Sequence, residues 1–329
     1  MADQTRPAAP RGMLVRDILD GVMEGGATGG SAARRGAAGR PTAAAAADLG
    51  PGTRVMDGAA GGSGAPLLDV QGVTLRYKTP SSLVTATHRV SFQVRRGDRY
   101  VVLGPSGCGK STMLKAVGGY MRPDEGRITI KDRVVTGPGA DRMMVFQEFD
   151  QLMPWKTVAE NVMFPLLAAR GMGRKDAAAR AGAYIDKVGL TKFRDSLPHT
   201  LSGGMKQRVA IARGMAMEPD ILLMDEPFAA LDALTRRRMQ DELLQLWADT
   251  QFTVMFVTHS IAEAIRIGNR ILLLSPHPGR VRAEIDGVDR INPTDGSAAR
   301  LEARIHELLF TERGAEDVDQ AEAVGAVHV

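Results

Sequence analysis

The sequence contains very little cysteine and no long apolar run. One cysteine, Cys108, occurs in 329 residues, so an internal disulfide is excluded and a reducing compartment is expected. No apolar run approaches the roughly 20 residues that a helix needs to cross a bilayer. The N-terminus also lacks the basic-then-apolar pattern of a secretory signal. We therefore expect a soluble, cytosolic chain that reaches a membrane only through a partner.

A strong excess of charge of one sign is also missing. Lys and Arg number 42 and Asp and Glu number 38, a net charge of +4, and both signs are scattered along the chain. Nucleic-acid-binding proteins usually concentrate their basic residues on one face, so no nucleic-acid partner is expected. The apolar fraction of 44% and the charged fraction of 24% are typical of a globular protein.

Composition divides the chain into three parts. Residues 1–65 are rich in Ala, Gly and Arg and have too few large apolar side chains to offset the entropy of ordering, so a flexible tail is predicted. The segment 13–23 could alternatively form a short amphipathic docking helix. Residues 66–285 carry the pattern of an ordered domain, and 286–329 are predicted to form a helix and an acidic tail.

Strand and helix patterns alternate along the ordered domain. The predicted strands cover 67–77, 83–94, 98–104, 143–147, 220–225, 252–257, 270–274 and 280–285. The predicted helices cover 111–119, 157–169, 174–188, 203–217, 233–248, 296–310 and a segment capped by Ser260 and Glu263. Such alternation indicates an α/β fold with a mainly parallel sheet covered on both faces. Thr157 and Glu160 have the spacing of a capping box, at the start of a predicted helical insertion over about 149–214.

A glycine-rich segment follows the strand at 98–104. Residues 104–111 (GPSGCGKS) match G-x-x-x-x-G-K-[ST], the phosphate-binding P-loop; a purely structural turn is the alternative. The glycines let backbone N–H groups curl around phosphate oxygens at the start of a helix. Lys110 is expected to reach the β- and γ-phosphates, and Ser111 to ligate Mg²⁺. The predicted nucleotide-binding residues here are Gly104, Pro105, Ser106, Gly107, Cys108, Gly109, Lys110, Ser111 and Thr112.

A second acidic motif ends the apolar strand at 220–225. Residues 221–226 (ILLMDE) place Asp225 and Glu226 at the carboxyl edge of the sheet, where the P-loop also lies. Asp225 is predicted to hold the Mg²⁺ shell through water. Glu226 is predicted to orient and deprotonate the attacking water. Apolar strands that end in acids are common, so this motif gains its weight from the P-loop before it.

A third motif, 201–208 (LSGGMKQR), opens a helix with a hydroxyl and two glycines, which would present N–H groups and a helix dipole to an anion. It resembles the signature motif of ABC ATPases. With the motifs before it, the resemblance covers about 67–285. It implies the P-loop NTPase (RecA-like) fold, with a parallel core, an antiparallel β-subdomain and the inserted helical subdomain.

The resemblance implies roles for four more residues. Tyr77 is similar to the aromatic residue that stacks on adenine, and Gln147 to the glutamine that senses Mg²⁺ and the attacking water. Asp232 resembles the loop acid that communicates across a dimer, and His259 the switch histidine that contacts the γ-phosphate. Tyr77 could instead be an ordinary strand aromatic, and His259 a neighbour of a capped helix.

The same resemblance implies a mechanism and partners. Two copies are expected to associate head to tail, so that ATP on one subunit is covered by the other subunit's signature motif, before hydrolysis with Mg²⁺. That motif contributes Ser202, Gly203 and Gly204. The expected partners are the second copy, a transmembrane permease and, indirectly, a periplasmic solute-binding protein, so the chain is expected to be peripheral at the cytoplasmic face of the inner membrane. Trp155, after Gln147, is the candidate contact for the permease; the alternative is that it belongs to the core, since tryptophan is usually well buried.

A narrower resemblance concerns the transported solute. FQEFDQLMPWKTVAENV, LTRRRMQDELLQLW and SPHPGRV look like segments of the nitrate, sulfonate and taurine importer ATPases. The alternative function is a soluble ABC-class ATPase that acts on nucleic acid or in cluster assembly; the absence of sustained heptads disfavours the DNA-maintenance type. Cys108 could act as a redox switch, although a small side chain that fits a tight loop is the simpler interpretation.

Overall fold

The computed structural model describes residues 54–56, 65–78, 83–147, 151–291 and 296–310. The predicted docking helix at 13–23 and the acidic tail after Phe310 lie outside these residues. Among the helices that the structure describes, none is long and apolar enough to span a bilayer.

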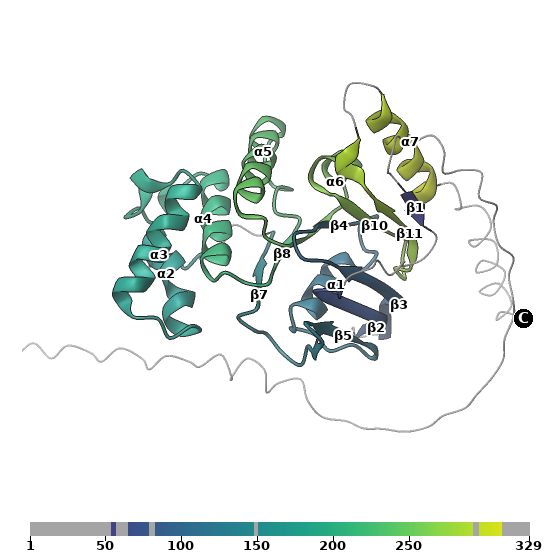
Figure 1. Ribbon diagram of the computed structural model, residues 1–329, viewed down its shortest axis with the longest axis horizontal. Coiled ribbons are helices and arrows are strands. Elements are labelled where there is room, and N and C mark those ends of the chain that lie inside the picture. The colour runs from purple at the N-terminus through teal and green to yellow at the C-terminus, as the bar shows by residue number, and fades with distance from the viewer. Residues whose placement is uncertain (1–53, 57–64, 79–82, 148–150, 292–295, 311–329) are drawn as a thin grey trace, which may run out of the picture. The chain divides into compact units, whose positions relative to one another are not determined.

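The main sheet has seven strands in the order β1-β11-β10-β4-β9-β8-β7 (Figure 1). The five from β10 to β7 are parallel, whereas β11 and β1 pair antiparallel at one edge. The strands are β1 (Arg54–Met56), β4 (Arg99–Leu103), β7 (Arg142–Val145), β8 (Ile221–Asp225), β9 (Val254–Thr258), β10 (Arg270–Leu274) and β11 (Val281–Asp286). The mainly parallel core that the sequence predicts is confirmed.

The two faces of this sheet pack into two different apolar cores. Val101 and Leu103 of β4 belong to a core shared with helices on one face. Tyr100 and Val102 alternate with them and belong to a second core. Side chains of a strand alternate between faces, and burial on both faces produces the uninterrupted apolar runs by which these strands were predicted.

A second, antiparallel sheet packs in the second core, in the order β3-β2-β5-β6. Its strands are β2 (Leu68–Lys78), β3 (Leu83–Val94), β5 (Glu125–Ile130) and β6 (Arg133–Val134). The first two were predicted. The other two were missed because β5 begins with three exposed residues and β6 has only two residues, both exposed.

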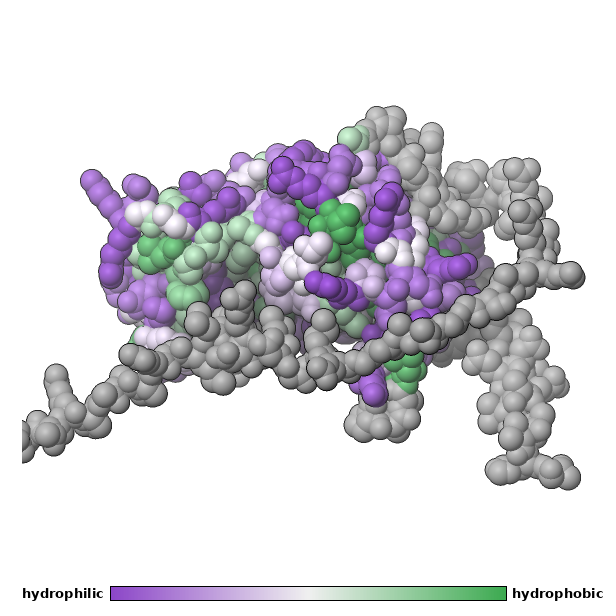
Figure 2. Space-filling model, turned by 90° about the horizontal axis from the view of Figure 1, so that it is seen from below, coloured by the Kyte–Doolittle hydropathy of each residue, from purple (hydrophilic) through white to green (hydrophobic). Residues whose placement is uncertain are grey.

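The helices follow the predicted segments closely. They are α1 (Lys110–Val117), α2 (Val158–Ala168), α3 (Arg174–Lys187), α4 (Gly203–Ala216), α5 (Ala233–Thr250), α6 (Ile261–Ile267) and α7 (Ser297–Phe310), with short 3₁₀ turns at Thr191–Phe193, Pro198–Thr200 and Val288–Arg290. Helices α2, α3 and α4 pack against one another. Figure 2 shows apolar surface at the left-hand end, the end at which α2 and α3 lie in Figure 1.

The predicted helix caps are only partly correct. Thr157 and Glu160 form the complete capping box of α2, because each backbone N–H donates to the other residue's side chain. Ser260 caps α6 by accepting from the N–H of Glu263. The carboxylate of Glu263 does not return to the cap; it accepts from Thr258 and Gln240 instead.

Two boundaries differ from the sequence prediction. Strand β1 lies inside the segment 1–65, so ordered structure does not begin at Pro66; three residues of that segment pair with β11. Strand β7 ends at Val145, so Gln147 lies beyond the strand that it was expected to end.

Candidate functional site

The P-loop connects β4 to α1 and forms the floor of a cavity of about 240 Å³. Strand β2 contributes Tyr77 to its wall, and β8 leads into Glu226. Tyr77 is 45% exposed, which leaves its ring free to stack on a base. The lining residues are Tyr77, Ala86, Ser106, Gly107, Gly109, Lys110, Ser111, Thr112 and Glu226. The structure thus gathers predicted residues from three separate segments of the chain.

Lys110, the first residue of α1, is folded back onto its own loop. Its ammonium donates to the carbonyl oxygens of Gly104 at 2.9 Å and of Pro105 at 2.8 Å, and only 4% of the residue is exposed. Gly104 and Pro105 do not line the cavity themselves, but their carbonyl groups hold Lys110 in place at its wall. A phosphate entering the loop would offer Lys110 a charged acceptor in place of two neutral ones.

Ser111 and Asp225 form a pair of oxygen ligands. The Ser111 hydroxyl donates to Oδ1 of Asp225 at 2.7 Å. Burial raises the pKa of Asp225, and the hydrogen bond from Ser111 partly opposes this shift. Hard cations such as Mg²⁺ prefer hydroxyl and carboxylate oxygens, and a cation beside Asp225 would favour its charged form. The pair therefore fits the metal role predicted for it.

Glu226 and His259 come together at the end of β8 and β9. Oε2 of Glu226 lies 2.9 Å from Nδ1 of His259, although the two residues are 33 positions apart. The backbone N–H of Glu226 donates to the carbonyl of Val257, and its φ of 42° is left-handed, a conformation that is costly for a residue other than glycine. Glu226 has this backbone conformation at the point where its residue lines the nucleotide cavity.

Residues of the signature motif line a different cavity, of about 220 Å³. Ser202 is the N-cap of α4, where its hydroxyl accepts from the N–H of Met205, as the sequence predicts for a helix start. The lining residues are Ser202, Gly204, Met205, Arg208, Leu234, Thr235, Arg238 and Met239. This cavity and the P-loop cavity share no residue, so within one chain the signature does not contribute to the P-loop site.

The three comparisons with known proteins agree. A family model described as ABC transporter matches residues 87–229. The chain is 50% identical to the taurine import ATP-binding protein TauB of Rhizobium johnstonii over 222 residues, which cover 67% of this chain and 84% of that protein. It is 43% identical to the protein of the same name from Ruegeria pomeroyi, with 66% and 81% covered.

The chain belongs to the ABC transporter ATPases. The solved structure of the ATP-binding cassette MJ0796, a dimer in a post-hydrolysis state bound to ADP and Pi, matches with a TM-score of 0.58 and 34% identity. The match covers 66% of this chain and 97% of that one. The activity of this ABC ATPase is ATP hydrolysis, and its fold is that of the P-loop NTPases.

The remaining predicted residues of this ABC ATPase lie outside both cavities. Asp232 is the N-cap of α5; hydrogen bonds from the N–H groups of Thr235 and Leu234 lower the pKa of its carboxyl. Gln147 is exposed and lines neither cavity. Their predicted contacts across a dimer or with a metal stay predictions.

Two further predictions concern exposure. Trp155 is 74% exposed, which contradicts the alternative that it belongs to the core. Cys108 is buried under the phosphate loop, and burial raises the pKa of its thiol although Lys110 opposes the shift. A buried thiol with a raised pKa is unreactive, so the structure favours the packing role over the redox switch.

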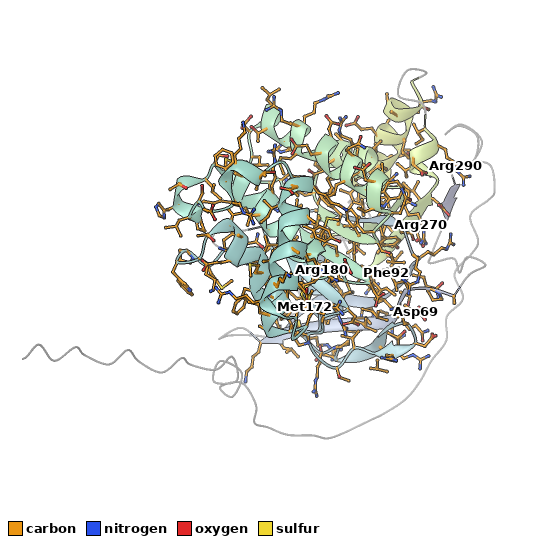
Figure 3. The ribbon with its side chains drawn as sticks, turned by 60° about the vertical axis from the view of Figure 1, so that its left-hand side comes forward. Asp69, Phe92, Met172, Arg180, Arg270 and Arg290 are labelled. Carbon is orange, nitrogen blue, oxygen red and sulfur yellow. The ribbon has the colours of Figure 1, made fainter. Side chains whose placement is uncertain are left out.

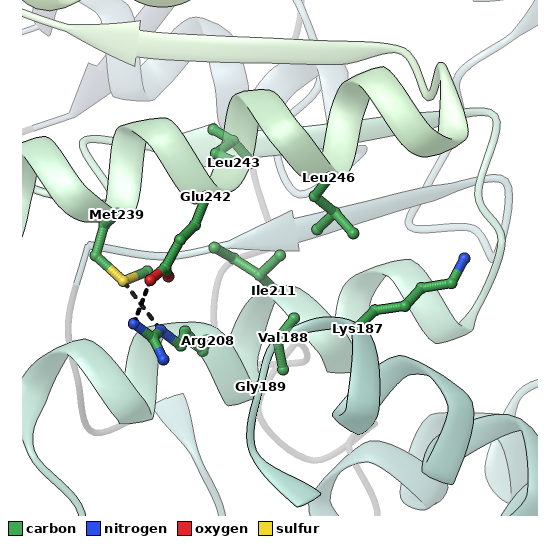
Figure 4. A pocket seen from close by; sticks show the side chains of 9 residues that line it. All are labelled: Lys187, Val188, Gly189, Arg208, Ile211, Met239, Glu242, Leu243 and Leu246. Carbon is green, nitrogen blue, oxygen red and sulfur yellow. Dashed lines mark hydrogen bonds and ion pairs between the residues drawn. The ribbon is translucent and has the colours of Figure 1, made fainter.

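A third cavity, of about 220 Å³, lies between α5 and the α3–α4 pair (Figure 4). Ile211, Leu243 and Leu246 give it an apolar interior, and Arg208 stands at one end beside Glu242 and Met239 (Figure 4). The Arg208 guanidinium donates to the Glu242 carboxylate at 2.6 Å and to the Met239 sulfur at 3.4 Å. This contact ties the signature helix α4 to α5.

Sequence reasoning missed the site residues that carry no motif of their own. Ala86 lines the nucleotide cavity from β3, and Arg238 and Met239 line the signature cavity from α5. Ala86 could not be recognised from the sequence, because its methyl side chain has no functional group that would indicate a binding site. The helical spacing of Thr235, Arg238 and Met239 places them on one face of α5, and this pattern could have pointed to a surface facing the signature helix.

Proposed function

We propose that the chain powers the import of a small anionic solute of the taurine, sulfonate or nitrate type through a separate transmembrane permease. The relatives named as taurine import proteins support this choice of solute. In this proposal the chain is peripheral at the cytoplasmic face of the inner membrane. A periplasmic solute-binding protein delivers the cargo to the permease.

The observation that carries the proposal is the separation of the two cavities. Ser202 and Gly204 present a helix N-terminus, an anion-binding element, away from the loop that contains Lys110 and Ser111. A second copy, placed head to tail, brings its own signature to the γ-phosphate. ATP then joins two positively polarised surfaces, and its cleavage lets them part, which is a ligand-biased two-state equilibrium.

Within this site each residue has a proposed task. Lys110 and the loop N–H groups bind the β- and γ-phosphates. Ser111 and Asp225, with Gln147, would hold Mg²⁺, whose positive charge would offset the negative charge of the phosphates. Tyr77 stacks on the adenine, which fixes the far end of the nucleotide and thereby orients the triphosphate.

Glu226 is the proposed general base. Before ATP binds, Nδ1 of His259, at 2.9 Å from Oε2, holds the carboxylate that later accepts a proton from the attacking water. His259 is about half exposed, so it can turn to the γ-phosphate when ATP arrives. Glu226 is then released for the water. Asp232, at the start of α5, is proposed to report this state across the dimer.

The proposed function is tested by solute uptake. A strain that lacks this chain is complemented with the wild-type protein or with Lys110→Ala, and accumulation of labelled taurine, an alkanesulfonate and nitrate is measured. The wild-type protein is expected to restore uptake of at least one of these solutes. With Lys110→Ala, uptake is expected to stay absent. Uptake that is unchanged by loss of the chain contradicts the proposed function.

A further inference from the structure

The loop between β10 and β11 folds beneath the phosphate loop. This loop, residues 275–280 (SPHPGR), has no task in the proposed hydrolysis. It is closed on itself, because Ser275 donates its N–H to the carbonyl of Arg280 at 2.9 Å and its hydroxyl accepts from the Arg280 N–H at 3.0 Å. The same hydroxyl lies within donating distance of two carbonyl oxygens of the turn, that of Pro276 at 2.9 Å and that of Pro278 at 3.1 Å. Gly279 is therefore presented by a defined turn rather than by a loose segment.

Gly279 is also tied to β3, which borders the nucleotide cavity. Its N–H donates to the carbonyl of Ala86 at 2.9 Å, and its own carbonyl accepts from the N–H of His88 at 2.9 Å. The two bonds make a parallel bridge with Thr87. Ala86 lines the nucleotide cavity, so this bridge reaches the wall of the site.

The phosphate loop packs closely against these two bridged elements. A Cβ built on Gly279 would lie 2.1 Å from the carbonyl oxygen of Cys108. A Cβ on Gly109, the next residue, would lie 2.6 Å from the carbonyl oxygen of Ala86 and 2.7 Å from the Thr87 methyl. The peptide group that joins Cys108 to Gly109 thus rests against the backbone bridge that Gly279 forms with β3.

We propose that Gly279 is a positioning residue for ATP: because it lacks a side chain, it lets the Cys108 carbonyl rest on the turn, and this contact sets the direction of the loop N–H groups that bind the phosphates. The inference rests on the proposed nucleotide site and adds a residue from a distant segment to it. Phosphate binding by a P-loop depends on several N–H groups that point to one place, so a displaced peptide loses more than one hydrogen bond.

The size of the effect follows from the contact distance. Real Cβ atoms essentially never approach another heavy atom within 3.0 Å, and the contact here is with a backbone oxygen at 2.1 Å, so the turn and the phosphate loop must separate by about 1 Å. Such a shift disturbs the hydrogen bonds from the loop to charged phosphate oxygens, and losing one such bond lowers affinity about tenfold or more. The φ of Gly279 lies outside the left-handed region, so alanine adds the contact without adding backbone strain.

The test is Gly279→Ala in the full chain. Affinities for MgATP and ADP are measured by calorimetry, and KM and kcat by phosphate release. Both affinities are expected to fall at least tenfold together, with a matching rise in KM, because both nucleotides use the hydrogen bonds of the same loop. Gly182→Ala is the matched control: no atom lies within 4 Å of a Cβ at Gly182, so its affinities should equal those of the wild type.

A purely structural role for Gly279 predicts a different result. It would lower the Tm of the nucleotide-free protein and leave the affinities of the folded protein within about threefold of wild type, and this outcome overturns the proposal. If Gly279→Ala does not fold, the second variant, Ser275→Ala, provides the test, because it removes the hydrogen bonds that close the turn without adding bulk. The affinity for ATP should then fall several-fold, and an unchanged affinity refutes the proposal. If the wild type itself binds no ATP, the proposed function fails instead.

Discussion

Arg270 joins three strands of the main sheet, and replacing it with methionine should be among the most damaging single changes in the chain. The residue is 1% exposed. Its guanidinium donates to Asp98 at 2.8 Å, to the carbonyl of Gln93 at 2.9 Å, and to Glu284, which also accepts from the Tyr100 hydroxyl at 3.0 Å. Figure 3 shows Arg270 among the packed side chains of the core. Strand β4 continues from this cluster into the P-loop.

The expected cost of Arg270→Met comes from the carboxylates left behind. Methionine replaces most of the aliphatic stem, so little packing is lost. Glu284 is fully buried and Asp98 is 6% exposed, and both lose their cation. Breaking a buried ion pair in this way destabilises proteins by about 3–5 kcal/mol. The cation–π contact with Tyr100, 5.0 Å from the ring centre, adds about 2 kcal/mol, because both groups are buried.

The loss of stability caused by Arg270→Met should also depend on pH. Burial raises the pKa of Glu284 above its ordinary 4.5, and Arg270 opposes that shift. Without Arg270 the pKa of Glu284 rises further. Above pH 4.5 the folded variant then binds more protons than the unfolded chain, so its stability falls as the pH rises through this window. The free-energy difference from wild type should therefore be larger at pH 8 than at pH 5.

Urea unfolding followed by far-UV circular dichroism at pH 5 and pH 8 measures both effects. Arg304→Met is the matched control, because Arg304 pairs with Glu307 on the exposed side of α7 and such pairs contribute about 0–1 kcal/mol. A free energy of unfolding for Arg270→Met within about 1 kcal/mol of wild type, or equal losses at the two pH values, would refute the reasoning.

Three further predictions concern the nucleotide site and its coupling. Lys110→Ala should lower ATP affinity by at least tenfold, since a charged hydrogen bond contributes about 1.5–3 kcal/mol; calorimetry that shows unchanged binding contradicts the P-loop role. Cys108 in the native protein should not react with a thiol reagent and should react after unfolding, because burial raises its pKa; prompt native reaction would restore the redox hypothesis. Trp155→Ala should leave basal hydrolysis unchanged and abolish solute uptake, because we propose that the exposed ring contacts the permease; unfolding of the variant would show a structural role.

Elements with a local signal could be predicted from the sequence. Strands β3 and β10 have the predicted bounds, because their buried residues produce apolar patterns within the segment itself. The capping box of α2 follows from the spacing of Thr157 and Glu160 alone. The motif residues of the P-loop also lie in the expected strand–turn–helix context.

Features that depend on distant segments could not be predicted in this way. Strand β1 exists because β11 offers a free edge, and a three-residue segment shows no periodicity of its own. The contact of Glu226 with His259 joins two strand ends that only the sheet order brings together. The exclusion of a side chain at Gly279 likewise depends on Cys108, which belongs to a loop far away in the sequence.

The most direct test of the account is the assembly state of Glu226→Gln. Loss of the general base should slow hydrolysis at least 10²-fold and leave MgATP trapped between the Lys110 loop of one copy and Ser202 of the other. Light scattering during size exclusion should show a dimer with saturating MgATP and a monomer without nucleotide. A strictly monomeric Glu226→Gln with bound MgATP, alone and beside the membrane subunits, would contradict the shared site.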